Sequence, residues 1–401
     1  MQYINQIIKA SRLLNFVSPE ILQPLIDQFN ADFSAKKLHA IIFFKLFLFS
    51  WAFDKKSLSL RTIAENSKSL TFKELAQLDG NFSAEKSSLG ERLEHIPYQL
   101  FQILFEQIAQ KAFTLSKNQL SSNKKLTELI NQSRILDSTV ITLSSKLLKV
   151  GYQINKGQLS LKASIAIQGK QIPIKALVLT DKKYSSEDKA LPKLFDFSKK
   201  NIIYIFDRGI QRLQTYVDIV DSENHFVSRL KAKNYNVVKI NSLPKNKETD
   251  KLTIIKDEFI VLDKIEKENN NKKQTFRLVT AISKKDNKQF QFITDLTDLS
   301  VIEITELYRY RWSIEVFFKF LKQELNLENL LSYNENGIKV HVYLTLIAFL
   351  LTWIFKEQNN IRSFKRAREK LRFALLDMLM KHQFQQGFLA GTKSKELLNP
   401  L

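Results

Sequence analysis

The chain has 401 residues, of which 44% are hydrophobic and 11% aromatic, including 30 Phe. This apolar content excludes a disordered chain, and the length predicts two or three domains with a sizeable core. The 62 Lys and Arg residues against 41 Asp and Glu give a net charge of +21, which favours a polyanionic partner such as nucleic acid. The excess is spread along the whole chain, so a lysine-rich composition with solvated faces remains an alternative.

The absence of cysteine excludes disulfides, thiolate metal sites and a cysteine nucleophile. The five histidines show no pair at zinc-ligand spacing, and the nine glycines form neither a phosphate-binding loop nor a dinucleotide fingerprint. These patterns give no support to zinc chemistry or to nucleotide-driven work.

The start of the chain lacks the pattern of a signal peptide, because its first residues lead into an amphipathic segment, Ile7–Phe16. The most apolar run, Val340–Phe355, is shorter than the ~20 residues needed to span a bilayer and predicts a buried core helix. We therefore expect a cytoplasmic, nucleoid-associated protein without a membrane partner.

Residues 1–128 show the helical spacing of apolar residues and almost no strand pattern, which predicts an all-helical N-terminal domain. Two of its segments, Ser57–Ala64 and Lys86–Arg92, fit a helix-turn-helix reader of DNA. Such segments also occur in plain helical bundles, so both interpretations stay open.

The pattern changes to strands after residue 128. Runs rich in Ile, Leu and Val predict strands at Arg134–Thr142, Gln158–Gln168, Ile172–Thr180, Asn201–Phe206 and Phe226–Leu230. Helices are expected at Ser186–Phe195 and Ile210–Ile219, so the region is predicted to be a mixed α/β sheet layered with helices.

A Lys- and Asn-rich stretch at about 232–298 contains further strand-like runs, which predict a β insertion. The expected strands are Val237–Ile240, Leu252–Leu262, Thr275–Ile282 and Phe290–Ile293. Helical spacing returns in three segments, Ile302–Leu325, Ile338–Glu357 and Ser363–His382.

Two aspartates occupy informative places in the predicted sheet. Asp137 lies within the apolar strand, where a carboxylate loses hydration and needs a cation or a donor; a turn capped with Ser138 is the alternative. Asp207 ends its strand at the edge where α/β folds bind ligands, and Gly209 would permit a sharp exit.

A third element is the polar stripe formed by Tyr308, Arg311, Glu315 and Lys322. At about 100° per residue these four side chains fall within one ~60° arc of a helix, next to an arc of apolar residues that can pack on the sheet. Ordinary charge pairs on a solvated face would explain Arg311 with Glu315, but not Tyr308.

This spacing, Tyr-x2-Arg-x3-Glu-x6-Lys, resembles the YREK signature of DDE transposases of the insertion-sequence-4 family. The contexts Asp137-Ser-Thr and Asp207-Arg-Gly also resemble the first two acids of that family, and Phe226–Lys231 is similar to a segment that follows the second. The resemblance covers roughly residues 130–330 and is weak in the flanking parts.

The resemblance implies a ribonuclease-H-like catalytic domain, with one acid on the first strand, one after the fourth, and a glutamate on a later helix beyond a β insertion. It implies that Asp137, Asp207 and Glu315 are catalytic and hold two Mg²⁺ or Mn²⁺ ions, which prefer oxygen ligands. It also implies that Tyr308, Arg311 and Lys322 bind the phosphates of DNA.

The implied activity is metal-dependent cut-and-paste cleavage of DNA and strand transfer, with terminal inverted repeats and target DNA as partners of a homodimer. The expected domains are 1–128, which binds DNA ends; 129–345, the catalytic domain; and 346–401, a helical region making dimer or DNA contacts. The basic run Arg362–Arg372 in that last region equally fits a solvated helix. Two rival functions remain: a ribonuclease-H-like nuclease that does not join strands, and a catalytically silent DNA-binding relic.

Overall fold

The computed structural model describes most of the chain. The described residues are 18–53, 58–117, 124–143, 151–155, 158–169, 171–210, 212–231, 234–244, 247–262, 274–324 and 330–374. The amphipathic segment predicted at Ile7–Phe16 and the end of the helix predicted at Ser363–His382 lie outside them.

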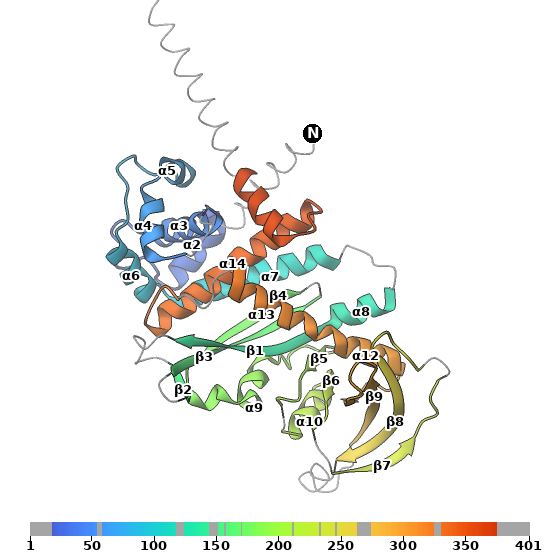
Figure 1. Cartoon of the computed structure of the whole chain (residues 1–401). Coiled ribbons are helices and arrows are strands. Elements are labelled where there is room, and N and C mark those ends of the chain that lie inside the picture. Colours follow the sequence, from blue (N-terminus) through green and yellow to red (C-terminus); the bar gives the residue numbers. More distant parts are fainter. Residues whose placement is uncertain are drawn as a thin grey trace, which may run out of the picture. The chain divides into compact units, whose positions relative to one another are not determined.

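The chain divides into two compact units, and the colours of Figure 1, which follow the sequence, allow the residues of each to be traced. Residues 1–112 together with 325–401 form one unit, here called the helical unit, and residues 113–324 form the other, the sheet unit. These limits differ from the predicted ranges, because residues 113–128 group with the sheet and residues 325–345 group with the N-terminal helices.

The described N-terminal part of the helical unit contains helices and no strand, which confirms the prediction of an all-helical region. Helix α4 begins with a capping box in which Ser59 and Thr62 satisfy each other's backbone amides. The helices are α2 (Pro19–Gln28), α3 (Ala40–Phe53), α4 (Leu60–Ser67), α5 (Leu70–Ala76), α6 (Lys86–His95) and α7 (Tyr98–Lys117), which continues into the sheet unit.

Helix α14 (Glu335–Gln358) is the apolar centre of the helical unit. It has 24 residues and is longer than the predicted run Val340–Phe355, so by length and composition it could cross a membrane. Within its apolar window, however, 94% is buried inside the protein, as the prediction of a core helix required. Its His341 packs edge-on against Phe47 of α3, and complete burial lowers the pKa of His341 to about 4.

The sheet unit combines ten described strands with helices. Its strands are β1 (Ser133–Leu143), β2 (Tyr152–Asn155), β3 (Gln158–Gln168), β4 (Ile172–Leu179), β5 (Ile203–Phe206), β6 (His225–Arg229), β7 (Tyr235–Ile240), β8 (Leu252–Leu262), β9 (Thr275–Ser283) and β10 (Gln289–Thr294). Its helical elements are α8 (Lys124–Gln132), η3 (Lys182–Ser185), α9 (Glu187–Ala190), η4 (Leu191–Leu194), α10 (Gln214–Asp221), α12 (Val301–Tyr310) and α13 (Trp312–Glu324).

Five strands form the centre of the sheet in the order β4-β3-β1-β5-β6. Strands β4, β3 and β1 are antiparallel neighbours, whereas β5 runs parallel to β1 and β6 parallel to β5. In Figure 1, α9 and α10 lie on one side of these strands, and α12 and α13 on the other. The arrangement confirms the predicted mixed, ribonuclease-H-like sheet.

The insertion at 232–298 does not form a separate sheet. Its last strand, β10, pairs antiparallel with β6, and β9, β8 and β7 follow outward from it. The insertion therefore lengthens the central sheet at the β6 edge.

Two details differ from the sequence prediction. Strand β2 was not predicted, so Asp207 follows the fifth strand along the chain and not the fourth. The single helix predicted at Ile302–Leu325 is two helices that meet at Arg311, where bonds from the Arg311 amide to Tyr308 and from the Ile314 amide to Arg311 tighten the backbone into an i to i+3 turn.

Candidate active site

Asp137 lies inside β1, between the completely buried Leu136 and the partly buried Ser138, whose hydroxyl is hydrogen-bonded to that of the buried Ser164 of β3. Its side chain is 19% exposed, and Oδ1 accepts a hydrogen bond of 2.7 Å from the amide of Ser138. Burial raises the pKa of Asp137 to about 6, with the negative charges of nearby glutamates adding to the effect. The strand continues through Asp137 without a turn, so the alternative of a turn cap is wrong, and the one amide contact leaves much of the charge uncompensated.

Asp207 follows β5 at the carboxyl edge of the same sheet. In the parallel pairing of β1 and β5, Leu136 faces Phe206, so Asp137 and Asp207 each come next on neighbouring strands. Oδ1 of Asp207 accepts hydrogen bonds of 2.8 Å from the Arg208 amide and 2.8 Å from the Tyr308 hydroxyl. Burial opposes the charge, but these donors and nearby arginines outweigh it and lower the pKa of Asp207.

Helix α12 brings Tyr308 to these acids. The helix begins at a capping box between Ser300 and Glu303 and packs on β5, β6 and β10. The ring of Tyr308 lies 5.0 Å from that of Phe292 of β10, and burial together with the charge of Asp207 raises the pKa of its hydroxyl. Tyr308 therefore stays protonated and acts as a hydrogen-bond donor to Asp207.

Arg311 lies at the junction of α12 and α13 and connects two acids. Its Nη2 lies 2.5 Å from Oε1 of Glu315, and its Nη1 lies 3.6 Å from Oδ2 of Asp137. The side chain is 11% exposed, and its Nε has no hydrogen-bond partner among the described residues. A single guanidinium thus stands between acids that come from β1 and α13.

The remaining acids of this helical segment face elsewhere. Glu303 accepts from the Ser300 amide and pairs with Lys125 of α8, and Glu306 pairs with Arg309. Neither takes the place that Glu315 occupies beside Arg311. Lys322 lies further along α13, where its Nζ donates to the Val140 carbonyl of β1 at 3.2 Å.

Three charged residues near these acids were not singled out from the sequence. They are Lys162 of β3, Glu187 at the start of α9, and Arg229 at the end of β6, whose charges act on Asp137 or Asp207. Lys162 carried the same signal as Asp137, a charge inside an apolar strand. Arg229 was part of the noted segment Phe226–Lys231, while Glu187 had no signal of its own.

Gly209 has a different role from the predicted one. Its φ is not among the positive values, so the sharp exit from β5 does not need a glycine conformation. A Cβ atom at this position would instead lie 1.4 Å from Oε2 of Glu187. The absence of a side chain makes room for that carboxylate.

The donor set fits a hard divalent cation, because it consists of carboxylate oxygens in a partly buried, acid-rich place. As the side chains stand, no three acidic or histidine residues in the described part of the chain are close enough to hold an ion together. Tyr308 and Arg311 occupy carboxylate oxygens instead. A cation that used these same oxygens as ligands would have to displace Tyr308 and Arg311 from them.

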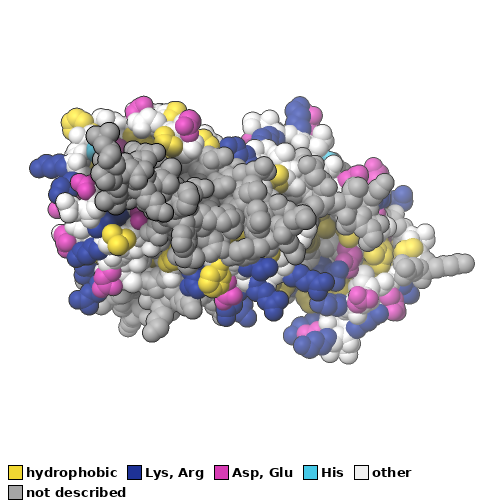
Figure 2. Space-filling view, turned by 90° about the horizontal axis from the view of Figure 1, so that it is seen from above, with side chains coloured by type: hydrophobic (Ala, Val, Ile, Leu, Met, Phe, Trp, Pro, Cys, Tyr) yellow, Lys and Arg dark blue, Asp and Glu magenta, His cyan; other side chains and the backbone are white. Residues whose placement is uncertain are grey.

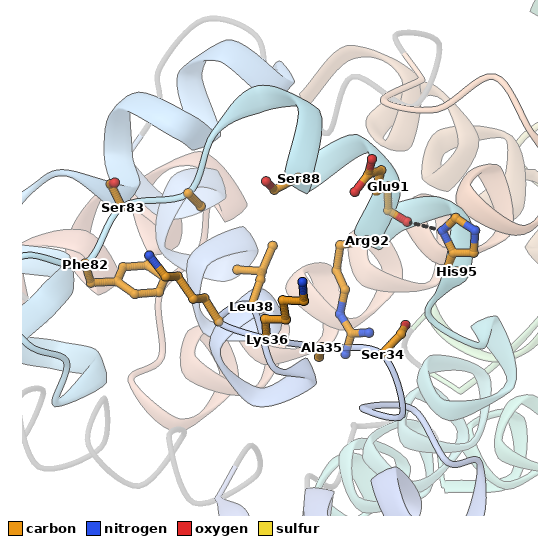
Figure 3. Close-up of a pocket in the computed structure, with 12 residues that line it drawn as sticks. Ser34, Ala35, Lys36, Leu38, Phe82, Ser83, Ser88, Glu91, Arg92 and His95 are labelled. Carbon is orange, nitrogen blue, oxygen red and sulfur yellow. Dashed lines mark hydrogen bonds between the residues drawn. The ribbon is translucent and has the colours of Figure 1, made fainter.

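A separate pocket of about 660 Å³ lies in the helical unit between α6 and the loop at 34–38 (Figure 3). Lys36 points into it, and Arg92 is held at its wall by Asp32 and by a bond of 2.8 Å to the Ala31 carbonyl. None of the residues predicted as catalytic or phosphate-binding lines this pocket. The helix-turn-helix interpretation of α4 and α6 stays a prediction.

The surface charge agrees with the even distribution along the sequence. On the face shown in Figure 2, Lys and Arg side chains recur across the visible surface and alternate with acidic ones. The positive excess is thus not confined to one patch of that face.

Comparison with known proteins shows that the chain matches the model of a known protein family. Residues 131–351, more than half of the chain, match the profile of the family described as transposase DDE domain. This range includes all six residues predicted as catalytic or phosphate-binding.

Similar proteins carry related names. A candidate transposase for insertion sequence element IS4SA from Synechocystis sp. is 28% identical over 245 residues, which cover 59% of this chain and 63% of the relative. A candidate transposase y4zB from Sinorhizobium fredii is 25% identical, covering 53% and 61%. A candidate transposase for IS5377 from Geobacillus stearothermophilus is 21% identical, covering 69% of each chain.

The chain spans less than two thirds of the length of the first two relatives. By its sheet, by the acids on that sheet and by the matched residues, the chain belongs to the transposase DDE domain family.

Proposed function

We propose that this protein is the transposase of an insertion sequence, which cuts DNA at the ends of its element and joins the cut ends to target DNA. The observation that carries the proposal is the grouping of acids from three elements around Arg311: Asp137 on β1, Asp207 after the adjacent parallel strand, and Glu315 on α13. The matched family and the names of the relatives support the same reaction.

In this proposal Asp137, Asp207 and Glu315 hold two Mg²⁺ or Mn²⁺ ions. When bound, such a pair activates a water or 3′-hydroxyl nucleophile and stabilises the leaving oxygen of an in-line displacement. Asp207 is ionised in the fold, as a ligand for a cation must be, because its pKa is lowered. Glu315 is more accessible than Asp137, because 36% of its side chain is exposed against 19% for Asp137.

Tyr308, Arg311 and Lys322 would bind the phosphates of the DNA. Arg311 suits this role because its guanidinium can bind a phosphate through two parallel hydrogen bonds. Its Nε–H donates no hydrogen bond to any of the described residues. When the Arg311 guanidinium moves to a phosphate, it no longer neutralises Asp137 and Glu315. Their carboxylates then become available to bind a metal ion. Phosphate binding and metal binding would in this way support each other.

The cleavage step breaks a phosphorus–oxygen bond of the DNA with water as nucleophile and leaves a free 3′-hydroxyl. In strand transfer, that hydroxyl attacks a phosphodiester of the target, and the target's own 3′-oxygen leaves. Two element ends must be held together for this, so we propose that a homodimer acts on DNA, in the cytoplasm.

The test uses the purified full chain and duplex DNA taken from both flanks of its own gene, where the ends of an insertion sequence lie. We expect cutting at the flanks and joining to a target plasmid with Mg²⁺. Asp137→Ala, Asp207→Ala and Glu315→Ala should each abolish cutting and largely retain end binding, because phosphate contacts provide most of the affinity. Glu306→Ala is the matched control and should cut normally.

Two other outcomes separate the rival functions. Cutting without joined products would identify a nuclease of the same fold that does not transfer strands. End binding without any metal-dependent cutting would identify a silent, DNA-binding relic. Equal loss of binding and cutting in the three acid variants would contradict their assignment as metal ligands.

A further inference from the structure

Glu187 is a fourth acid beside the proposed catalytic centre. It begins the short helix α9, after the loop that follows β4, and its side chain is half-buried. Its charge acts on Asp137 and is itself influenced by Asp207 and Arg311. An acid from a third part of the chain thus lies within the electrostatic reach of both strand acids.

The carboxylate of Glu187 rests on the backbone of the turn that carries Asp207. An ideal Cβ on Gly209 would lie 1.4 Å from Oε2 and 2.6 Å from Cδ of Glu187, and no real side chain could occupy that space without displacing the carboxylate. Because the φ of Gly209 is not positive, close approach alone accounts for the glycine. The positions of Glu187 and of the Asp207 turn are therefore matched to each other.

Lys162 of β3 compensates part of this charge. Its side chain is only 4% exposed, and its Nζ donates a hydrogen bond of 2.6 Å to the Ser185 carbonyl, two residues before Glu187. Its charge acts on both Glu187 and Asp137. With Asp207 and Glu315, four acids share this place with three cations, the buried Lys162 and Arg311 and the nearby Arg229, so negative charge remains in excess.

We propose that Glu187 is a positioning residue of the catalytic centre: resting on Gly209, it fixes the turn that carries Asp207 and adds the negative charge that draws a divalent cation to Asp137 and Asp207. This inference rests on the proposed function, because it assumes that these two acids bind metal. It assigns Glu187 an indirect effect, through the charge and placement of the two aspartates.

The first test measures Mn²⁺ binding to the full chain by isothermal titration calorimetry, without DNA turnover. Glu187→Gln keeps the size of the side chain and removes its charge. We expect it to weaken Mn²⁺ binding by about 10- to 100-fold, the loss typical when a partner of metal ligands is changed. Glu248→Gln removes the same charge from an exposed position of the sheet unit, 56% exposed, and should bind Mn²⁺ like the wild type.

A second variant separates charge from placement. Gly209→Ala keeps every charge but forces the Glu187 carboxylate away from the turn. We expect it to weaken Mn²⁺ binding as well. The loss of Mn²⁺ binding in the double variant should be smaller than the sum of the losses in the two single variants, because both changes disrupt the same contact. Thermal unfolding of each variant checks that it folds.

The outcomes distinguish this inference from the proposed function. If Asp137→Asn weakens Mn²⁺ binding while folded Glu187→Gln and Gly209→Ala bind like the wild type, the inference is wrong and the proposed function stands. If Asp137→Asn also binds like the wild type, or the wild type binds no Mn²⁺, both are wrong. Loss in Glu187→Gln without loss in Gly209→Ala would overturn the positioning role.

Discussion

Two buried clusters of charge in the sheet unit differ in how completely they are paired. In the insertion, Arg277 of β9 donates from Nε and Nη2 to both oxygens of Asp257 of β8, at 2.8 and 2.9 Å. Its Nη1 donates to the carbonyls of Thr297 and Leu299. The two residues are 7% and 3% exposed, so this ion pair is buried and its hydrogen bonds are almost all made.

The cluster around Arg311 is left incomplete. Its Nη1 is 3.6 Å from Asp137, too far for a hydrogen bond, and its Nε has no partner among the described residues. Asp137 keeps a raised pKa in spite of the nearby arginine. Unpaired buried charge costs folding free energy, so an arrangement of this kind is expected where a ligand completes it. The degree of pairing, and not burial, therefore separates the Arg277–Asp257 pair from the candidate active site.

The two clusters are also connected along the chain. The carbonyls that Arg277 binds belong to Thr297 and Leu299, in the segment that leads to Ser300. Ser300 caps the start of α12, the helix that carries Tyr308. The complete ion pair therefore anchors the start of the helix that reaches the incomplete one.

The largest expected effect concerns Asp137. Asp137→Asn should lower cleavage on the order of 10⁴-fold, the loss seen when one member of a concerted catalytic group is removed. It should leave the unfolding temperature unchanged or raise it, because a buried charge and its repulsion by neighbouring acids disappear. Gel assays of cleavage and calorimetric unfolding measure the two effects. A large fall in stability would show that Asp137 belongs to a structural pair instead.

Removing the charge of Asp257, in the buried pair with Arg277, should instead destabilise the protein. Asp257→Ala leaves the Arg277 charge buried without its partner and should lower the free energy of unfolding by about 3 to 5 kcal/mol, as measured by urea denaturation. The double change Asp257→Leu with Arg277→Met is the control and should cost less than the single change, because no unpaired charge remains. If Asp257→Ala lowers the free energy of unfolding by less than 1 kcal/mol, the Asp257–Arg277 pair does not differ from the Arg311 cluster in its contribution to stability.

A smaller effect is expected for Arg311 in DNA binding. If Arg311 neutralises one phosphate, Arg311→Gln should reduce the steepness of the log–log salt dependence of binding by about 0.9, the slope for one neutralised phosphate. Fluorescence anisotropy over a range of NaCl concentrations measures the slope. A wild-type affinity that does not change with salt would exclude nucleic acid as the main partner.

The smallest effect concerns the pair that joins β6 to the end of β10. Nδ1 of His225 lies 2.6 Å from Oδ2 of Asp295, and this hydrogen bond raises the pKa of His225 above its ordinary value of 6.5. The folded state therefore binds a proton more tightly than the unfolded state. The resulting stabilisation is complete below pH 6.5 and is lost as the pH rises through the raised value.

The difference in unfolding temperature between the wild type and His225→Gln isolates this contribution. We expect the difference to be small and to shrink as the pH is raised from 6 to 9. A difference that grows with pH would contradict the assigned direction. His225 lies beside Ile203 at the start of β5, whereas Asp207 follows the other end of that strand, so the measurement tests the contact between β6 and the end of β10 separately from the acids.

Local pattern was sufficient for the elements that depend on neighbouring residues alone. The alternation of apolar residues placed β3 and β8 at their observed limits, and an Asp inside or directly after an apolar strand marked Asp137 and Asp207. The same pattern did not reveal β2, whose four residues form a strand through pairing with β3. Short elements of this kind are stabilised by cross-strand contacts, which a one-dimensional pattern does not contain.

The sequence by itself predicted the class of fold, the order of most elements, and three acids with a polar stripe as candidate site residues, because each is a periodic or local property of the chain. Only the tertiary structure decided that the insertion extends the sheet beside β6, that the predicted helix divides at Arg311, and that Glu187 rests on Gly209. The two residues of that last contact belong to segments that are also joined by a hydrogen bond from the Arg212 amide to Asp188 of α9. Burial, charge pairing and close approach depend on such long-range contacts, and for that reason they cannot be derived from residue spacing.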